Sequence, residues 1–258
     1  MVSLDNLTVS YHQHPALHHI SGEFLSGSLT AVVGPNGSGK STLLKSIMGL
    51  LPTSGGNIKV SVPGARMAYL PQVAEIDRSF PISVHDCVLL GCWQQQGPWG
   101  CVDDGQHARV SAAIDAVGLN GFEQRPISSL SSGQLQRVLF ARMLVQDADL
   151  ILLDEPFNAI DSKTTAALLG IIAQWQQQGR TVMAVLHDDA QVRRHFPQTL
   201  LLARELVAWG PTAQVMTEAH LSTARAMAEA WDEDAELCAI DASSASKGAP
   251  RDLLRVGV

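Results

Sequence analysis

The sequence predicts an α/β fold in which parallel strands, joined by right-handed crossovers, form a central sheet. Short, continuous apolar runs that suit buried strands alternate along the chain with longer stretches of helical spacing. A glycine-rich segment, residues 34–42, stands between an apolar run and a helical stretch, and a second apolar run ends at Asp154. The 258 residues suit one large domain or a core with a subdomain.

The N-terminal half supplies the first strands. Residues 2–11 alternate loosely between apolar and polar side chains, which predicts a strand that ends at Tyr11. The histidines that follow indicate a polar hairpin loop, with metal binding as the alternative; they are His12, His14, His18 and His19. We then expect a buried strand at 29–33, a helix at 43–48, a turn at 51–56, and strands near 57–62 and 65–70.

The second half alternates helices and strands before its composition changes. The run 149–154 is apolar until its last residue, which fits a central strand buried on both faces. Residues 211–241 form an acidic, partly helical extension with a helix around 221–233, and residues 242–258 suit a flexible tail. The other expected elements are helices at 83–90, 107–117, after Leu130 and at 162–178 (closed by Gly179), a loop at 94–100, and strands at 181–186, 200–202 and 206–209.

The overall composition excludes several classes of protein. A hydrophobic content of 46% is ordinary for a globular chain, and no apolar run approaches the roughly 20 residues of a membrane span. The first residues lack the pattern of a signal peptide, and the net charge of −7 argues against a nucleic-acid partner. The cysteines have no paired metal-ligand spacing and fit reduced thiols of a cytosolic protein: Cys87, Cys92, Cys101 and Cys238.

The glycine-rich segment fits the phosphate-binding pattern G-x-x-x-x-G-K-[ST]. Gly37 and Gly39 leave room for phosphate oxygens near the backbone and allow unusual dihedral angles. Lys40 can reach the β and γ phosphates, and the Ser41 hydroxyl can bind Mg²⁺. The expected ATP-binding residues here are Gly34, Pro35, Asn36, Gly37, Ser38, Gly39, Lys40, Ser41 and Thr42.

The acidic pair that ends the second apolar run resembles a Walker B site. A carboxylate at Asp154 lies where it can hold Mg²⁺ beside the phosphate loop, and Glu155 can act as general base toward the attacking water. The alternative, a solvated strand end, is disfavoured because the preceding strand is apolar throughout.

Taken in order with Gln72, Asp161 and His187, these motifs resemble an ATP-binding cassette protein from Val2 to Gly210. The family signature usually reads Leu-Ser-Gly-Gly-Gln, and here it reads Leu-Ser-Ser-Gly-Gln, with Ser132 where glycine is usual. The resemblance implies that this segment binds the γ-phosphate of ATP held by a second subunit. The signature residues are Ser131, Ser132, Gly133 and Gln134.

The resemblance also implies roles for single residues. Tyr11 would stack on adenine, and Asp161 would lie in the loop that crosses the dimer interface. The catalytic residues would be Glu155, His187 and Gln72, and the Mg²⁺ ligands Ser41, Gln72 and Asp154.

The family resemblance further implies an architecture and partners. It implies a P-loop NTPase (RecA-like) core in an ATPase domain at 1–210, with an antiparallel β subdomain and an inserted α-helical subdomain at about 84–145. Two copies, or a paired cassette, would close on ATP and Mg²⁺. An integral membrane permease would hold the protein at the cytoplasmic face of the inner membrane, together with a secreted or periplasmic metal-binding protein.

A narrower resemblance concerns residues 72–91. The order of Asp77, Phe80-Pro81, Ser83 and Asp86 looks like the segment of zinc and manganese importers that meets the membrane subunit. Phe80 would insert into that subunit or, alternatively, pack beneath its own helical subdomain.

Three other functions stay open. One is a siderophore, haem or cobalamin importer, and another is a soluble cassette ATPase of DNA repair or translation, which usually carries paired cassettes or a coiled coil. The third is a metal-binding regulatory module, although a solvated acidic surface suits the same residues better: His220, Asp232, Glu233, Asp234, Glu236 and Cys238.

Overall fold

A six-stranded sheet forms the centre of the computed structural model, which describes residues 1–11 (without the Tyr11 side chain), 14–63, 66–72, 76–93, 102–158 and 160–230. Its strand order is β5-β6-β7-β3-β8-β9, and the first five strands are mutually parallel. β9 instead returns antiparallel to β8, which the sequence did not predict. The bounds are β3 Leu29–Val33, β5 Met67–Leu70, β6 Leu150–Asp154, β7 Thr181–Val185, β8 Gln198–Ala203 and β9 Glu205–Pro211.

The central strands are buried on both faces, as their apolar runs predict. Every residue of β3, β6 and β7 is buried. Alternate residues enter two different apolar clusters: Val32 packs with the α1 side of the sheet, whereas Ala31 packs with the opposite side. This double burial fixes the carboxyl ends of the parallel strands as one rigid edge.

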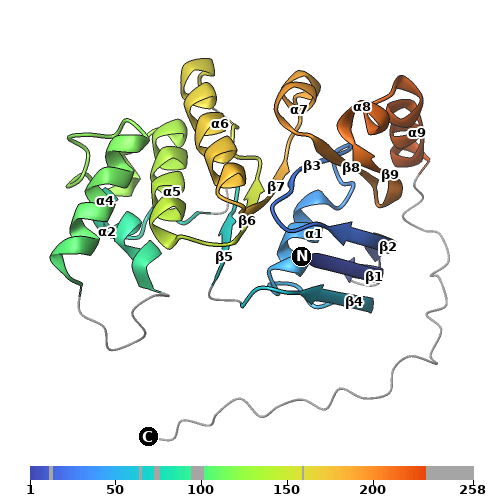
Figure 1. Cartoon of the computed structure of the whole chain (residues 1–258), viewed down its shortest axis with the longest axis horizontal. Helices are drawn as coiled ribbons and strands as arrows, with labels where there is room; N and C mark the ends of the chain where they lie inside the picture. Colours follow the sequence, from blue (N-terminus) through green and yellow to red (C-terminus); the bar gives the residue numbers. More distant parts are fainter. Residues whose placement is uncertain (12–13, 64–65, 73–75, 94–101, 159, 231–258) are drawn as a thin grey trace, which may run out of the picture.

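An antiparallel sheet covers the α1 side, with the order β2-β1-β4 (Figure 1). The strands are β1 Val2–Tyr11, β2 His14–Phe24 and β4 Gly55–Val60, and helix α1 spans Lys40–Ile47. The hairpin-loop interpretation of the histidines is wrong for His14, His18 and His19, because all three lie in β2; His12 lies outside the described residues. His18 Nδ1 lies 3.0 Å from Glu205 Oε1, so the ring helps join this sheet to β9.

A group of helices forms one end of the molecule, at the left of Figure 1. It contains α2 Val84–Leu89, the short helix η3 Leu90–Cys92, α4 Asp104–Ala116, η4 Ile127–Ser129 and α5 Ser132–Gln146. α5 joins this group to the core, because Gln136 Nε2 donates to the Pro156 carbonyl at 3.0 Å. The loop expected at 94–100 lies outside the described residues.

The remaining helices are α6 Ser162–Gln177, α7 Asp189–His195, α8 Thr212–Val215 and α9 Glu218–Glu229. Gly179, with φ 79°, follows the end of α6 in the left-handed conformation that the predicted C-cap requires. α7 was not predicted from the sequence. None of the helices in the described residues is long and apolar enough to cross a membrane.

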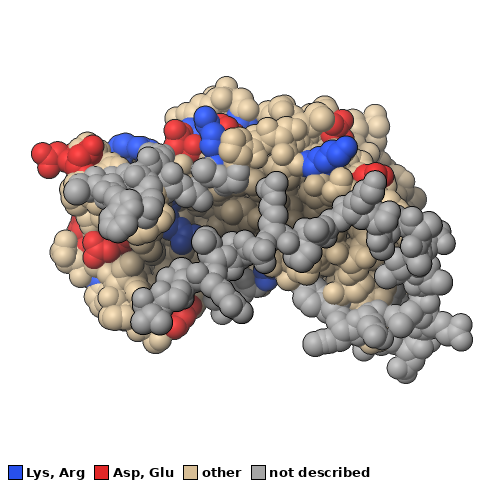
Figure 2. All heavy atoms as spheres, turned by 90° about the horizontal axis from the view of Figure 1, so that it is seen from below, with Lys and Arg blue, Asp and Glu red and all other residues tan. Residues whose placement is uncertain are grey.

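Figure 2 shows acidic and basic side chains in small, separate groups over the described part of one face. The exposed apolar side chains include Phe80, which is 60% exposed. The alternative in which Phe80 packs beneath its own helices is therefore wrong.

Candidate nucleotide-binding site

The phosphate loop connects the end of β3 to the start of α1. Gly37 and Gly39 have φ angles of 75° and 89°, which confirms the predicted unusual dihedrals. Gly39 is also crowded, because a Cβ atom there would lie 2.3 Å from the Ala16 carbonyl oxygen. The loop therefore requires glycine at 39 both for its conformation and for the approach of β2.

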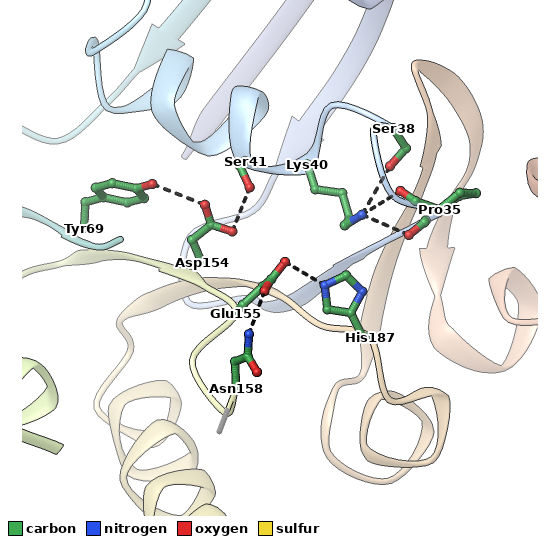
Figure 3. Close-up of polar contacts among 10 residues, drawn as sticks. Pro35, Ser38, Lys40, Ser41, Tyr69, Asp154, Glu155, Asn158 and His187 are labelled. Carbon is green, nitrogen blue, oxygen red and sulfur yellow. Dashed lines mark hydrogen bonds and ion pairs between the residues drawn. The ribbon is translucent and has the colours of Figure 1, made fainter. Parts of the chain in front are cut away.

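Lys40 is buried and folds back onto its own loop (Figure 3). Its Nζ donates to the carbonyl oxygens of Gly34 at 2.9 Å and Pro35 at 2.7 Å. Burial lowers the pKa of the ammonium group, and the nearby carboxylates of Glu155 and Asp154 partly oppose that shift. The side chain is a partly desolvated cation, which phosphate oxygens can attract strongly.

Asp154 is fully buried at the carboxyl end of β6, as the Walker B interpretation requires. Its carboxylate accepts hydrogen bonds from the Ser41 hydroxyl at 2.9 Å and the Tyr69 hydroxyl at 3.3 Å (Figure 3). The paired oxygens of Ser41 and Asp154 are the type of ligand that Mg²⁺ prefers, so these residues fit that ion. Tyr69 was not among the predicted site residues, and its one signal is its place in the strand beside β6.

Glu155 is held by two side chains and by an uncommon backbone conformation. Its Oε1 lies 2.7 Å from His187 Nε2, and its Oε2 accepts from Asn158 Nδ2 at 3.3 Å. Its φ angle is 50°, in the left-handed region that non-glycine residues rarely adopt. Such local strain is common in functional sites, where the surrounding structure holds it in place.

The phosphate loop, Gln72 and Glu155 border one open pocket of about 320 Å³, whereas Gly34, Pro35 and His187 line a second one. Gln72 and Glu155 face the phosphate loop across the first pocket, so the structure brings together the predicted residues from three parts of the sequence. Ala16 of β2 was missed, because its segment was interpreted as a loop. Tyr11 ends β1, but its side chain lies outside the described residues. The residues that line the first pocket are Ala16, Asn36, Gly37, Ser38, Gly39, Lys40, Ser41, Thr42, Gln72 and Glu155.

The signature residues and Asp161 do not line this pocket; they lie at the N-termini of α5 and α6 instead. Ser131 is the N-cap of α5, and its side chain and that of Gln134 form a reciprocal capping box. Asp161 caps α6 by accepting from Thr164, and these hydrogen bonds lower the pKa of the Asp161 carboxyl group. Ser131 and the first residues of α6 are exposed and residues 132–134 are half-buried, so an anionic partner can approach both helix N-termini.

Ser132 has a partner from a distant part of the sequence. The Arg78 guanidinium donates to the Ser132 hydroxyl at 2.8 Å and to the Leu130 carbonyl oxygen at 3.4 Å. The side chain that departs from the usual signature thus contacts the segment that carries Phe80.

The metal-binding alternatives gain no support from the described residues. Among them, no group of three His, Cys, Asp or Glu side chains is placed to hold a metal ion. His220 lies in α9 with its Nδ1 3.0 Å from the Val215 carbonyl oxygen, and the acidic residues expected beside it lie outside the described residues. Cys87 and Cys92 are buried free thiols, and burial raises the pKa of both.

The comparisons with known proteins point in one direction. The family model described as "ABC transporter" matches residues 17–158. The zinc transport system ATP-binding protein TroB of Treponema pallidum is 40% identical and aligns over 86% of each chain. The manganese transport system ATP-binding protein MntB of Bacillus subtilis is 39% identical over 85% of this chain and 90% of its own. A structure of an inward-facing transporter described as metal-chelate type is 29% identical, with a TM-score of 0.77 over 87% and 88% of the two chains.

Proposed function

This chain belongs to the ABC transporter family, and on that basis we propose that it is the ATPase subunit of an importer for zinc or manganese ions. The observation that carries the proposal is the likeness to TroB and MntB over more than four-fifths of the chain. The pocket between the phosphate loop, Gln72 and Glu155 supports the proposal, and the exposed Phe80 segment suits contact with a separate membrane permease.

We infer that the pocket binds ATP through the backbone of the phosphate loop and through Lys40. On binding, the Lys40 ammonium would exchange its two carbonyl acceptors for phosphate oxygens. Ser41, Gln72 and Asp154 would hold Mg²⁺, which neutralises phosphate charge when bound.

Hydrolysis would depend on Glu155 as the general base. The imidazole of His187 and the amide of Asn158 fix the Glu155 carboxylate. The carboxylate therefore loses little side-chain freedom when it accepts a proton from water. A positioned base contributes on the order of 10²–10⁴ in rate. Tyr11 would stack on the adenine ring.

The catalytic unit would contain two copies of the chain. The signature residues lie at the partly exposed N-terminus of α5, outside the lining of the pocket of the same chain, so they suit the γ-phosphate of ATP in a second copy. Asp161 would lie at the same interface. Because each site is complete only in the closed dimer, hydrolysis would follow its opening and closing.

The complex would place this chain at the cytoplasmic face of the inner membrane, bound to its permease. A secreted or periplasmic metal-binding protein would deliver the ion on the other side. Import of a metal chelate is the second candidate, favoured by the likeness to the metal-chelate type transporter.

Deleting the gene tests the substrate. We expect lower cellular zinc or manganese under limitation, with growth rescued by the added metal or by the wild-type gene but not by Glu155→Gln. Mass-spectrometric metal content is the readout, and abundance of the Glu155→Gln protein is the control. Unchanged metal content together with a defect in haem, siderophore or cobalamin uptake would replace the proposal with the second candidate.

A further inference from the structure

Arg78 joins two segments that have different roles in the proposed function. One is the exposed Phe80 segment, defined as residues 77–82, and the other is the signature at the start of α5. The Arg78 side chain is half-buried, and its two terminal nitrogens reach Ser132 Oγ at 2.8 Å and the Leu130 carbonyl oxygen at 3.4 Å. These acceptors stand on either side of Ser131, the N-cap of α5.

The geometry of a guanidinium group makes this contact directional. Its N–H donors form a planar fork, so two acceptors fix its orientation better than one point charge would. The hydroxyl of Ser132 supplies one acceptor, and glycine at this position would remove it. The fork also adds positive charge beside a helix N-terminus, where an incoming phosphate would be favoured.

Arg78 attaches the Phe80 segment to the signature before Phe80, and Ile82 attaches it to Ile127 after Phe80. Before Phe80, the Asp77 carboxylate accepts from the Ser79 backbone N–H at 2.9 Å and from the Ser79 hydroxyl at 2.6 Å, which holds the turn that contains Arg78. After Phe80, the Ile127 backbone N–H donates to the Ile82 carbonyl at 3.0 Å. Phe80 itself remains 60% exposed between these two attachments.

We propose that Arg78 is a positioning residue that couples the Phe80 segment to the signature through Ser132 and Leu130. When ATP of a second copy engages the signature, the Arg78 fork passes the change in the α5 N-terminus to the segment that meets the permease. The coupling is reciprocal, so a partner seated on Phe80 biases the signature in turn. This inference rests on the proposed function, because it requires ATP to bind between two copies.

Hydrogen exchange of the full-length chain tests the coupling. The parent carries Glu155→Gln, and it is compared with the same chain carrying Arg78→Gln or Arg78→Lys, each with and without ATP and Mg²⁺. In the parent, ATP is expected to slow exchange at residues 34–42, 131–135 and 77–82. Both Arg78 variants should keep the slowing at 34–42. At 77–82 the slowing caused by ATP should be about tenfold smaller, as expected for loss of a charge-assisted hydrogen bond.

A matched control and a double variant exclude a merely structural role. Arg125→Gln removes an arginine whose guanidinium lies over the Phe122 ring, 4.1 Å from its centroid, in the same group of helices, and it should leave the ATP effect at 77–82 unchanged. Arg78→Gln combined with Ser132→Ala should reduce the ATP effect at 77–82 no further than Arg78→Gln alone does. The reason is that Ser132→Ala removes a contact that Arg78→Gln has already removed.

Two results would overturn the inference. If the Arg78 variants speed exchange at 77–82 equally with and without ATP, Arg78 only holds the segment in place. If ATP gives no protection at 34–42 in the parent chain, the proposed function and the coupling fail together.

Discussion

The phosphate-loop pocket and the signature end of α5 differ in how far one chain completes them. At the pocket, Ser41 of α1 and Glu155 already have partners within the chain, Asp154 and His187, which lie at or just after the ends of buried strands. At the signature, Ser131 only caps its own helix at an exposed surface. One region is therefore preorganised by folding, whereas the other, in the proposed function, would acquire its role from a second copy.

Glu155→Gln should have the largest effect and should separate the two regions. It removes the proposed base while the amide keeps the size of the side chain, so turnover is expected to fall by roughly 10²–10⁴-fold. ATP should still bind, and sedimentation should show a monomer without nucleotide and a dimer with ATP. Near-normal ATPase activity would refute the role of Glu155, and a monomer under both conditions would refute the paired site.

Phe80→Ala should affect only the exposed Phe80 segment and its contact with the permease. Because the side chain is 60% exposed, thermal unfolding and basal ATPase activity should hardly change. Pull-down of the membrane permease should weaken by about 30-fold, as for an interface residue worth about 2 kcal/mol. An unchanged pull-down of the permease would refute the role of Phe80 in that contact.

Tyr69→Phe should have the smallest effect, inside the preorganised pocket. It removes the hydroxyl that donates to Asp154 while the ring remains, which costs about 0.5–1.5 kcal/mol. We expect a decrease in ATPase activity of roughly 2- to 10-fold, measured at saturating ATP and Mg²⁺, and a normal dimer in sedimentation. A loss as large as that of Glu155→Gln would show that Tyr69 takes part in the chemistry.

Local patterns predicted most of the core, and distant contacts explain what they missed. The apolar runs of β3, β6 and β7 are visible because both faces are buried. β2 was missed because its pairing with β1 shifts register repeatedly, so its buried residues, Leu17, Ile20 and Phe24, do not alternate regularly.

The candidate site divides in the same way. Its motif residues could be named from the sequence, because a phosphate loop and an acidic strand end have local signatures. The contact of Tyr69 with Asp154 and that of Arg78 with Ser132 join residues 85 and 54 positions apart. Such contacts depend on how the sheet and the helices pack, which local periodicity does not encode.

The left-handed backbone of Glu155 has a consequence for how this chain can change. At φ 50° glycine is the residue with the lowest conformational cost. A substitution chosen for folding stability alone would therefore replace Glu155 with glycine and remove the carboxylate. Selection for thermal tolerance and selection for turnover therefore oppose each other at this position. A variant library screened only for heat resistance would be expected to accumulate inactive chains here, whereas the same screen would leave the sheet interior intact.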